Sequence, residues 1–301
     1  MAAGDAVIHI ERVSIRLKQR VITGAIFAAL VLTVLFLSHT FVYVAVITLL
    51  GIIGTVEMLK CIGVLRNLVL SVPALLYATI CPLIAMRFRY GVLMAATLGF
   101  MFFMLFLLVF AHERVKTESV CTAYTMVVYI TICFVCLIKL RYVTMDVGSN
   151  SGRMVGQYIY LLVFLAAWIT DTFAYFTGFF FGKHKLCPNI SPKKTVEGAV
   201  GGVVFCIISF LVYGFVVSEM FNLEPNYIGL AVVGLVMSVL AQIGDLLASV
   251  IKRTYGVKDY GRVFPGHGGV LDRFDSVLLL APFLLVLSED AQFLSILFNM
   301  V

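Results

Sequence analysis

The stretch Tyr227–Val250, YIGLAVVGLVMSVLAQIGDLLASV, decides how this chain folds. It is apolar for most of its length, shows no alternation of polar and apolar residues, and carries a single charged side chain, Asp245. About 20 apolar residues cross a bilayer core of roughly 30 Å as a helix, and a helix satisfies its own backbone polar groups there. The stretch therefore predicts a membrane-spanning helix.

Similar apolar runs recur along the chain. Hydrophobic residues make up 62% of the sequence and charged residues 13%, and the mean hydropathy is +1.07. Soluble domains are roughly 45–50% apolar and about 25% charged. The expected fold class is therefore all-α, a polytopic integral membrane protein with about nine transmembrane helices. The expected spans are 21–37, 41–59, 67–86, 91–111, 121–138, 157–181, 198–217, 227–250 and 275–298.

The distribution of positive charge predicts the orientation. If the N-terminus is cytoplasmic, the inner segments hold 17 of the 22 Lys and Arg residues, and five lie outside. The net charge of +6 suits anionic lipid headgroups or phosphate ligands and requires no nucleic acid. The first span lacks a small-residue cleavage site and is interpreted as a retained helix. With no organelle address in so short a chain, we expect a bacterial cytoplasmic (inner) membrane, with the active site on the cytoplasmic side.

The chain divides into a scaffold half, 1–150, and a site-bearing half, 151–301, which contains two cytoplasmic loops, 182–197 and 251–275. In the shorter loop, Ser191-Pro192 is a helix-start signal that places Lys193 and Lys194 in the first helical turn. Cations there oppose the helix dipole unless an anion binds. The lysine pair therefore indicates either a phosphate site or ordinary juxtamembrane charges.

Carboxylates within apolar segments are a sharper signal. Asp171 and Asp245 both lie in predicted spans, where an ionised group is costly and usually faces a polar interior. At helical spacing Gln242, Asp245, Ser249 and Lys252 share one face. An interhelical hydrogen-bond seam would also produce such a stripe, but a seam needs no acid, so a functional site is favoured.

Glu57, in the second span, is open to two interpretations. It is either a buried hydrogen-bonding residue or a partner for Lys60 one turn away.

The stretch Gly261–Ser276, GRVFPGHGGVLDRFDS, concentrates polar chemistry. Its glycines allow close backbone approach and positive φ, as a phosphate-binding loop requires. Asp272 and Asp275 follow, and Mg²⁺ typically takes one or two carboxylates together with substrate phosphates. Acidic groups for a metal beside basic groups for phosphate indicate phosphoryl or nucleotidyl transfer. The basic residues nearby are Lys252, Arg253, Lys258 and Arg262.

The segment Ser249–Asp275, SVIKRTYGVKDYGRVFPGHGGVLDRFD, resembles the signature of the phosphatidate cytidylyltransferases, also called CDP-diacylglycerol synthases. The segments Ser191–Gly198, SPKKTVEG, and Asp171–Leu186, DTFAYFTGFFFGKHKL, are also similar to that family. The resemblance covers about residues 165–285. It implies a dimeric helical membrane enzyme that joins CTP to phosphatidic acid, giving CDP-diacylglycerol and diphosphate.

The resemblance also implies site residues. Asp245 and Asp272 are the expected ligands of Mg²⁺, with a monovalent cation, K⁺, beside it. The other expected catalytic residues are Lys252, Arg253 and His267. The expected phosphate-binding residues are Ser191, Lys193, Lys194, Ser249, Lys258, Gly266, Gly268, Gly269 and Arg273. Additional candidates are Asp171, Glu197 and Asp275.

Three other classes of function are weighed against this one. An ion or solute transporter would use intramembrane acids but would spread polar residues over the full membrane depth. A CTP-dependent polyprenol kinase would keep the nucleotide and change the acceptor, and the complete signature disfavours it. A scaffold or sensor leaves the acidic and basic clusters unexplained.

Overall fold

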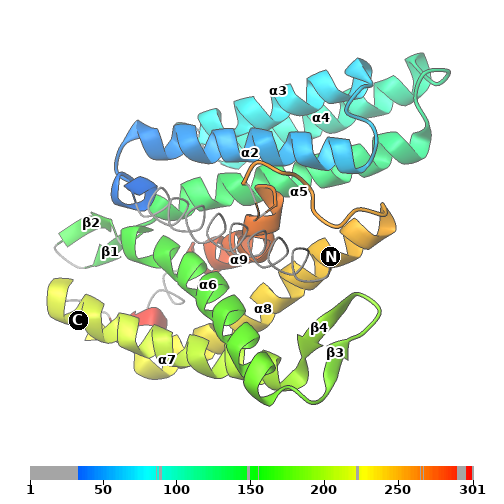
Figure 1. The fold of residues 1–301 in the computed structure, drawn as a ribbon. Coiled ribbons are helices and arrows are strands. Elements are labelled where there is room, and N and C mark those ends of the chain that lie inside the picture. Colours follow the sequence, from blue (N-terminus) through cyan, green and yellow to red (C-terminus); the bar gives the residue numbers. More distant parts are fainter. Residues whose placement is uncertain are drawn as a thin grey trace, which may run out of the picture.

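The computed structural model describes residues 33–85, 87, 90–147, 150–154, 156–221, 224–264, 266, 268–289 and 296–299. Helices dominate these residues (Figure 1). They are α2 (Phe41–Cys61), α3 (Leu68–Ala85), α4 (Tyr90–Phe110), α5 (Thr117–Arg141), α6 (Gly156–Phe181), α7 (Val196–Phe221), α8 (Tyr227–Thr254) and α9 (Leu271–Ser288).

The helices agree closely with the predicted spans. Seven of them, α2 to α8, are long and apolar enough to cross a membrane, and they coincide with the second to eighth predicted spans. The predicted first span, 21–37, lies mostly outside the described residues. The predicted ninth span corresponds to α9, which begins earlier than expected, at Leu271, and ends at Ser288. The total of nine spans and the cytoplasmic N-terminus stay predictions.

The helices form two groups with α9 between them (Figure 1). One group is α2–α5 and the other is α6–α8, while α9 packs against α5, α8, α6 and α2. The ring of Phe134 on α5 lies 5.7 Å from that of Phe274 on α9, and both side chains belong to the large core that joins the two groups. Because α9 carries Asp272 and Asp275 at its start, this packing places two acids where the groups meet.

The outward face of α4 is strongly apolar. Only 17% of the most apolar stretch of α4 is buried, and Phe102, Phe106 and Phe110 are 54%, 60% and 83% exposed. Water-soluble proteins rarely expose such contiguous apolar area. A hydrocarbon surrounding removes that cost, so this face is suited to contact with lipid.

In the described residues, two short hairpins and one pair of two-residue strands qualify the all-α expectation. The strands are β1 (Thr144–Val147) with β2 (Asn150–Met154), β3 (Lys185–Cys187) with β4 (Ser191–Thr195), and β5 (Glu224–Pro225) with β6 (Phe298–Asn299). Each pair is antiparallel. Each joins residues at the ends of helices, where backbone groups need partners outside the helix.

The predicted helix start at Ser191-Pro192 is wrong. Ser191 pairs with Cys187 and Thr195 with Lys185 in the β3–β4 hairpin, so this segment is extended. Helix α7 begins at Val196, and Thr195 Oγ1 accepts a hydrogen bond from Gly198 N at 3.1 Å, which is the geometry of an N-cap. Pairing with β3 holds residues 191–195 in an extended conformation, so they cannot form the first turn of a helix. The lysines that follow Pro192 therefore lie on a strand.

Candidate active site

The predicted polar stripe lies on α8 and includes Lys252, because the helix continues to Thr254. Gln242 Nε2 donates to Ala199 O on α7 at 3.2 Å. One turn further, Asp245 Oδ2 lies 2.6 Å from Lys194 Nζ on β4. At the end of the helix, Lys252 Nζ lies 2.8 Å from Asp272 Oδ1 on α9. The face predicted from the helical spacing therefore binds to three different elements.

Asp245 is one of three carboxylates that act on one another electrostatically. Asp171 comes from α6 and Asp275 from α9, and the charges of Asp171 and Asp245 both act on Asp275. Ser276 Oγ donates to Asp171 Oδ2 at 3.3 Å, and Ser276 N donates to Asp275 Oδ1 at 2.9 Å. Like charges this near repel, so the ion pair of Asp245 with Lys194 stabilises the group. We call Asp171, Asp245 and Asp275 the acidic group.

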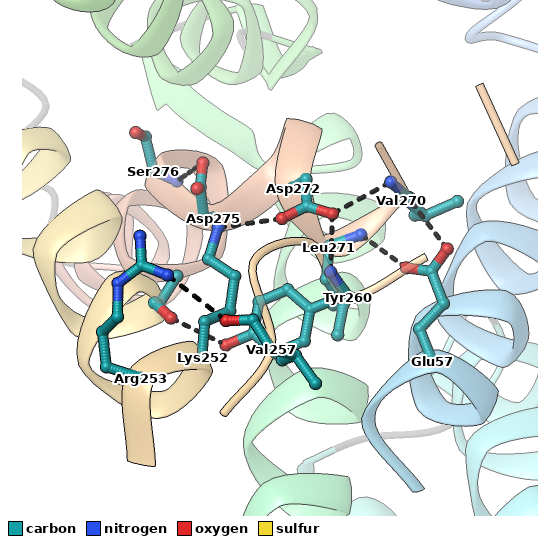
Figure 2. A network of polar contacts seen from close by, with 12 residues as sticks. Glu57, Lys252, Arg253, Val257, Tyr260, Val270, Leu271, Asp272, Asp275 and Ser276 are labelled. Carbon is teal, nitrogen blue, oxygen red and sulfur yellow. Dashed lines mark hydrogen bonds and ion pairs between the residues drawn. The ribbon is translucent and has the colours of Figure 1, made fainter. Parts of the chain in front are cut away.

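Asp272 occupies a different environment, shown in Figure 2. Its Oδ1 binds Lys252, and its Oδ2 accepts hydrogen bonds from Tyr260 N at 2.8 Å and Gly269 N at 2.9 Å. Only 6% of the Asp272 side chain and 11% of the Lys252 side chain are exposed. Both oxygens thus accept hydrogen bonds. Through Oδ2, this carboxylate joins two parts of the loop between α8 and α9, at Tyr260 and at Gly269.

Lys252 connects Asp272 to the acidic group. Besides its ion pair with Asp272, its charge acts on Asp275. Its ammonium also lies 5.2 Å from the centroid of the Tyr260 ring. Burial raises the pKa of Tyr260 well above its usual value, so the phenol stays protonated and donates to Ala248 O at 3.1 Å. The aromatic ring therefore forms a fixed wall beside the lysine.

The loop between α8 and α9 is tightly turned. Gly266 and Gly268 adopt φ of +79° and +86°, which side chains with a Cβ rarely take. Phe264 N donates to Gly268 O at 2.9 Å across this turn. A Cβ on Gly268 would also lie 2.8 Å from Asp272 Oδ2. The predicted glycine loop is present, although Pro265 and the predicted catalytic His267 lie outside the described residues.

Glu57 has a role that the sequence left open. Its Oε1 accepts from Val270 N and its Oε2 from Leu271 N, both at 3.0 Å, and the residue is 5% exposed (Figure 2). Lys60, the other suggested partner, is exposed one turn further along α2. Of the two interpretations, Glu57 is therefore the buried hydrogen-bonding residue. The only signal for it in the sequence is a lone carboxylate in an apolar run.

The remaining predicted residues are more dispersed. Glu197 accepts from Lys183 N and His184 N and pairs with His184 Nδ1 at 2.6 Å, so it holds the start of the β3–β4 hairpin. Arg253 is exposed, and its Nη1 donates to Val257 O at 3.4 Å. Ser191 and Ser249 are half-buried, whereas Lys193, Lys258, Gly266 and Arg273 are exposed.

The donor set suits a hard cation such as Mg²⁺. Asp171 on α6, Asp245 on α8 and Asp275 on α9 are near enough for their charges to act on one another, and carboxylate oxygens are the ligands that Mg²⁺ prefers. Within the described part of the chain, no three His, Cys, Asp or Glu side chains are arranged to hold an ion by themselves.

The fold and this site define a class: helical proteins suited to a bilayer, with paired acids and lysines where the helices meet the connecting loops. Comparison with known sequences narrows the class. A model of the Cytidylyltransferase family matches residues 18–289, and the chain belongs to that family.

Curated relatives agree with the family assignment. The chain is 34% identical over 276 residues to the phosphatidate cytidylyltransferase of Bacillus subtilis, covering 89% of this chain and 96% of that protein. It is 45% identical over 153 residues to the phosphatidate cytidylyltransferase of Staphylococcus haemolyticus, covering 50% of this chain. That match spans just over half, 57%, of the staphylococcal protein.

Proposed function

We propose that this protein is a phosphatidate cytidylyltransferase, which converts CTP and phosphatidic acid into CDP-diacylglycerol and diphosphate. A phosphate oxygen of the lipid attacks the α-phosphorus of CTP, and the bond from that phosphorus to the α–β bridging oxygen breaks. The electron pair of that bond leaves with diphosphate. The relatives' names support this choice of reaction.

One structural observation carries the proposal. Lys194 forms an ion pair with Asp245 of the acidic group, and Lys252, whose charge acts on Asp275 of that group, forms a second ion pair with Asp272. In each pair, the lysine can move from its carboxylate to the phosphate of an arriving substrate. The carboxylate is then free to bind another cation. A site that brings two polyanions together needs such exchangeable charges.

The lysines orient the substrates in this scheme. Lys194 is exposed enough, 25% at its side chain, to reach a nucleotide arriving from the water phase. Lys252 is held more rigidly between Asp272 and the ring of Tyr260, so it is assigned to charge developing on the departing diphosphate. Arg253, Lys258 and Arg273 extend the cationic surface around the loop and are assigned to the outer phosphates.

Little help from a general base is needed. The second pKa of a phosphomonoester lies near 6, so phosphatidate is mostly a dianion at neutral pH. His267 is therefore assigned as a hydrogen-bond donor to a phosphate. Asp171, through its contact with Ser276, is assigned to orientation of the first turns of α9.

Asp245 and Asp272 are the proposed ligands of Mg²⁺, with K⁺ beside it. When bound there, Mg²⁺ would neutralise charge on the phosphates of CTP. Asp275 and Asp171 stand next to Asp245 and are the further candidates for contact with this ion. In the structure, Lys194 and Lys252 form ion pairs with Asp245 and Asp272. Both lysines would move to phosphate oxygens as the substrates bind.

The site is proposed to lie at the cytoplasmic side of a bacterial inner membrane. Phosphatidate would reach it laterally from the inner leaflet and CTP from the cytosol. The segment 251–275, which joins α8 to α9, carries five Lys and Arg residues, and the positive-inside rule assigns such a segment to the cytoplasm. A homodimer stays a prediction.

The decisive test uses the full-length protein purified in detergent. CTP labelled at its α-phosphate and, in separate reactions, at its γ-phosphate is supplied with Mg²⁺ and either phosphatidic acid or a polyprenol, and lipid products are separated by chromatography. We expect labelled CDP-diacylglycerol from phosphatidic acid. A phosphorylated product from the polyprenol alone would overturn the proposal in favour of a polyprenol kinase.

A further inference from the structure

Glu57 links the scaffold helices to the start of α9. The first N–H groups of a helix have no partner within it, and they are usually satisfied by a side chain nearby in sequence. In α9 the residue before the helix, Val270, provides no side-chain cap. Glu57, from α2 and more than 200 positions away, accepts from both Val270 N and Leu271 N instead.

The loop backbone is folded directly against this carboxylate. A Cβ placed on Gly261 or on Gly269 would collide with the carboxyl group of Glu57. A side chain at either position would therefore displace the Glu57 carboxylate from its place against the loop. The fit is specific, because the carboxylate has backbone on two sides and two hydrogen bonds at its oxygens.

The same turn of chain carries the contacts of Asp272. Gly269 N, adjacent to the two amides held by Glu57, donates to Asp272 Oδ2, and Lys252 pairs with Asp272 Oδ1. The network in Figure 2 thus runs from α2 through Glu57 to the start of α9, and from Asp272 to Lys252 on α8. A shift of Glu57 would move Asp272 and its lysine partner together.

We infer that Glu57 is a positioning residue of the active site: it fixes the first turn of α9, and so the place of Asp272 and Lys252, without contacting substrate. The catalytic part of this inference rests on the proposed cytidylyltransferase reaction. The anchoring of the loop does not, and it is measured separately.

The test compares Glu57→Gln with the wild-type protein in detergent. The amide group of glutamine presents a donor to one of the two backbone donors, so one hydrogen bond is lost and the turn is displaced. Because a misplacement of about 1 Å can cost roughly 100-fold in rate, we expect kcat to fall about 10- to 100-fold. The KM values for CTP and phosphatidic acid should change much less, since no substrate contact is removed.

Two further variants sharpen the result. Glu57→Asp keeps the charge and should recover part of kcat. Gly261→Ala pushes a methyl group against Glu57 and should reproduce the loss. Glu118→Gln, the same chemical change at an exposed position at the start of α5, is the matched control and should behave as wild type.

Hydrogen–deuterium exchange provides a readout independent of activity. In Glu57→Gln the amides of residues 260–264 and 268–271 should exchange faster, while the other helices keep their protection. Unchanged exchange in this loop together with wild-type kcat would overturn the inference, as would a uniform rise in exchange over all helices. If the wild-type protein makes no CDP-diacylglycerol, the proposed function fails, and the exchange result still decides the anchoring.

Discussion

The two helical groups use their polar side chains differently. In α2–α5 several threonines bond back to the carbonyl four residues earlier, as Thr48 and Thr55 do at 2.7 and 2.8 Å, so they add no link between helices. Around α6–α8, and between that group and α9, the charged side chains join different elements, as Lys194 on β4 does with Asp245 on α8. The first group is held mainly by packing, whereas the second holds charges that a ligand can rearrange. Glu57 is an exception, because it lies on α2 and binds α9.

The largest expected effect is on catalysis and comes from the second group. Asp245→Asn removes the carboxylate that pairs with Lys194 and is proposed to bind Mg²⁺. Removing one group that stabilises transition-state charge typically costs about 10²- to 10³-fold in kcat. We expect a loss of at least this size in the CDP-diacylglycerol assay. The control is Glu118→Gln, the same acid-to-amide change at the exposed start of α5, and wild-type activity in Asp245→Asn would refute the assignment.

Lys252→Met tests the most buried ion pair. It leaves Asp272 without its cation, and an uncompensated buried charge costs about 3–5 kcal/mol in free energy of unfolding. The double variant Lys252→Met/Asp272→Asn removes that charge and should recover much of the stability but no activity. Denaturation in mixed micelles gives the free energies. Equal stability of the single and double variants would show that the unpaired charge of Asp272 carries no such cost.

Lys194→Ala should have a smaller effect. Its pair with Asp245 is partly exposed, with side chains 25% and 29% accessible, so water already screens the interaction. We expect roughly a tenfold rise in KM for CTP, the loss of one charge-assisted phosphate contact, with little change in thermal midpoint. Initial rates at varied CTP measure it. A change in KM for phosphatidic acid alone would assign Lys194 to the lipid.

Tyr77→Phe, in the first group, should change stability alone. The phenol shares a 2.8 Å hydrogen bond with Thr97, and Thr97 Oγ1 itself donates to Leu93 O. The variant therefore loses one hydrogen bond and leaves no buried donor unpaired, at about 1 kcal/mol. The ring stays stacked on Phe100 at 4.5 Å between centroids. A fall in kcat would show that the scaffold group influences the site through more than Glu57.

Part of the site could be predicted from helical spacing. Asp245 and Lys252 fall on one face of α8 because seven residues make two helical turns, and both are paired on that face. The place of Lys194 could not be predicted in this way. Ser191-Pro192 is a local pattern typical of a helix start, but pairing with β3 holds the segment in an extended conformation. This pairing places Lys194 beside Asp245 on α8.

The amino-acid sequence by itself determined that the chain is a set of long apolar helices with acids and bases concentrated near two loops. These properties follow from the residue composition and from the spacing of residues along each helix, and both can be read within a short segment of the chain. Only the tertiary structure decided which charge meets which: that Asp272 binds Lys252 and the loop amides, that Asp245 stands with Asp171 and Asp275, and that Glu57 holds the start of α9. Such contacts join residues far apart in sequence, and their partners are fixed by how the helices pack, which no local pattern specifies.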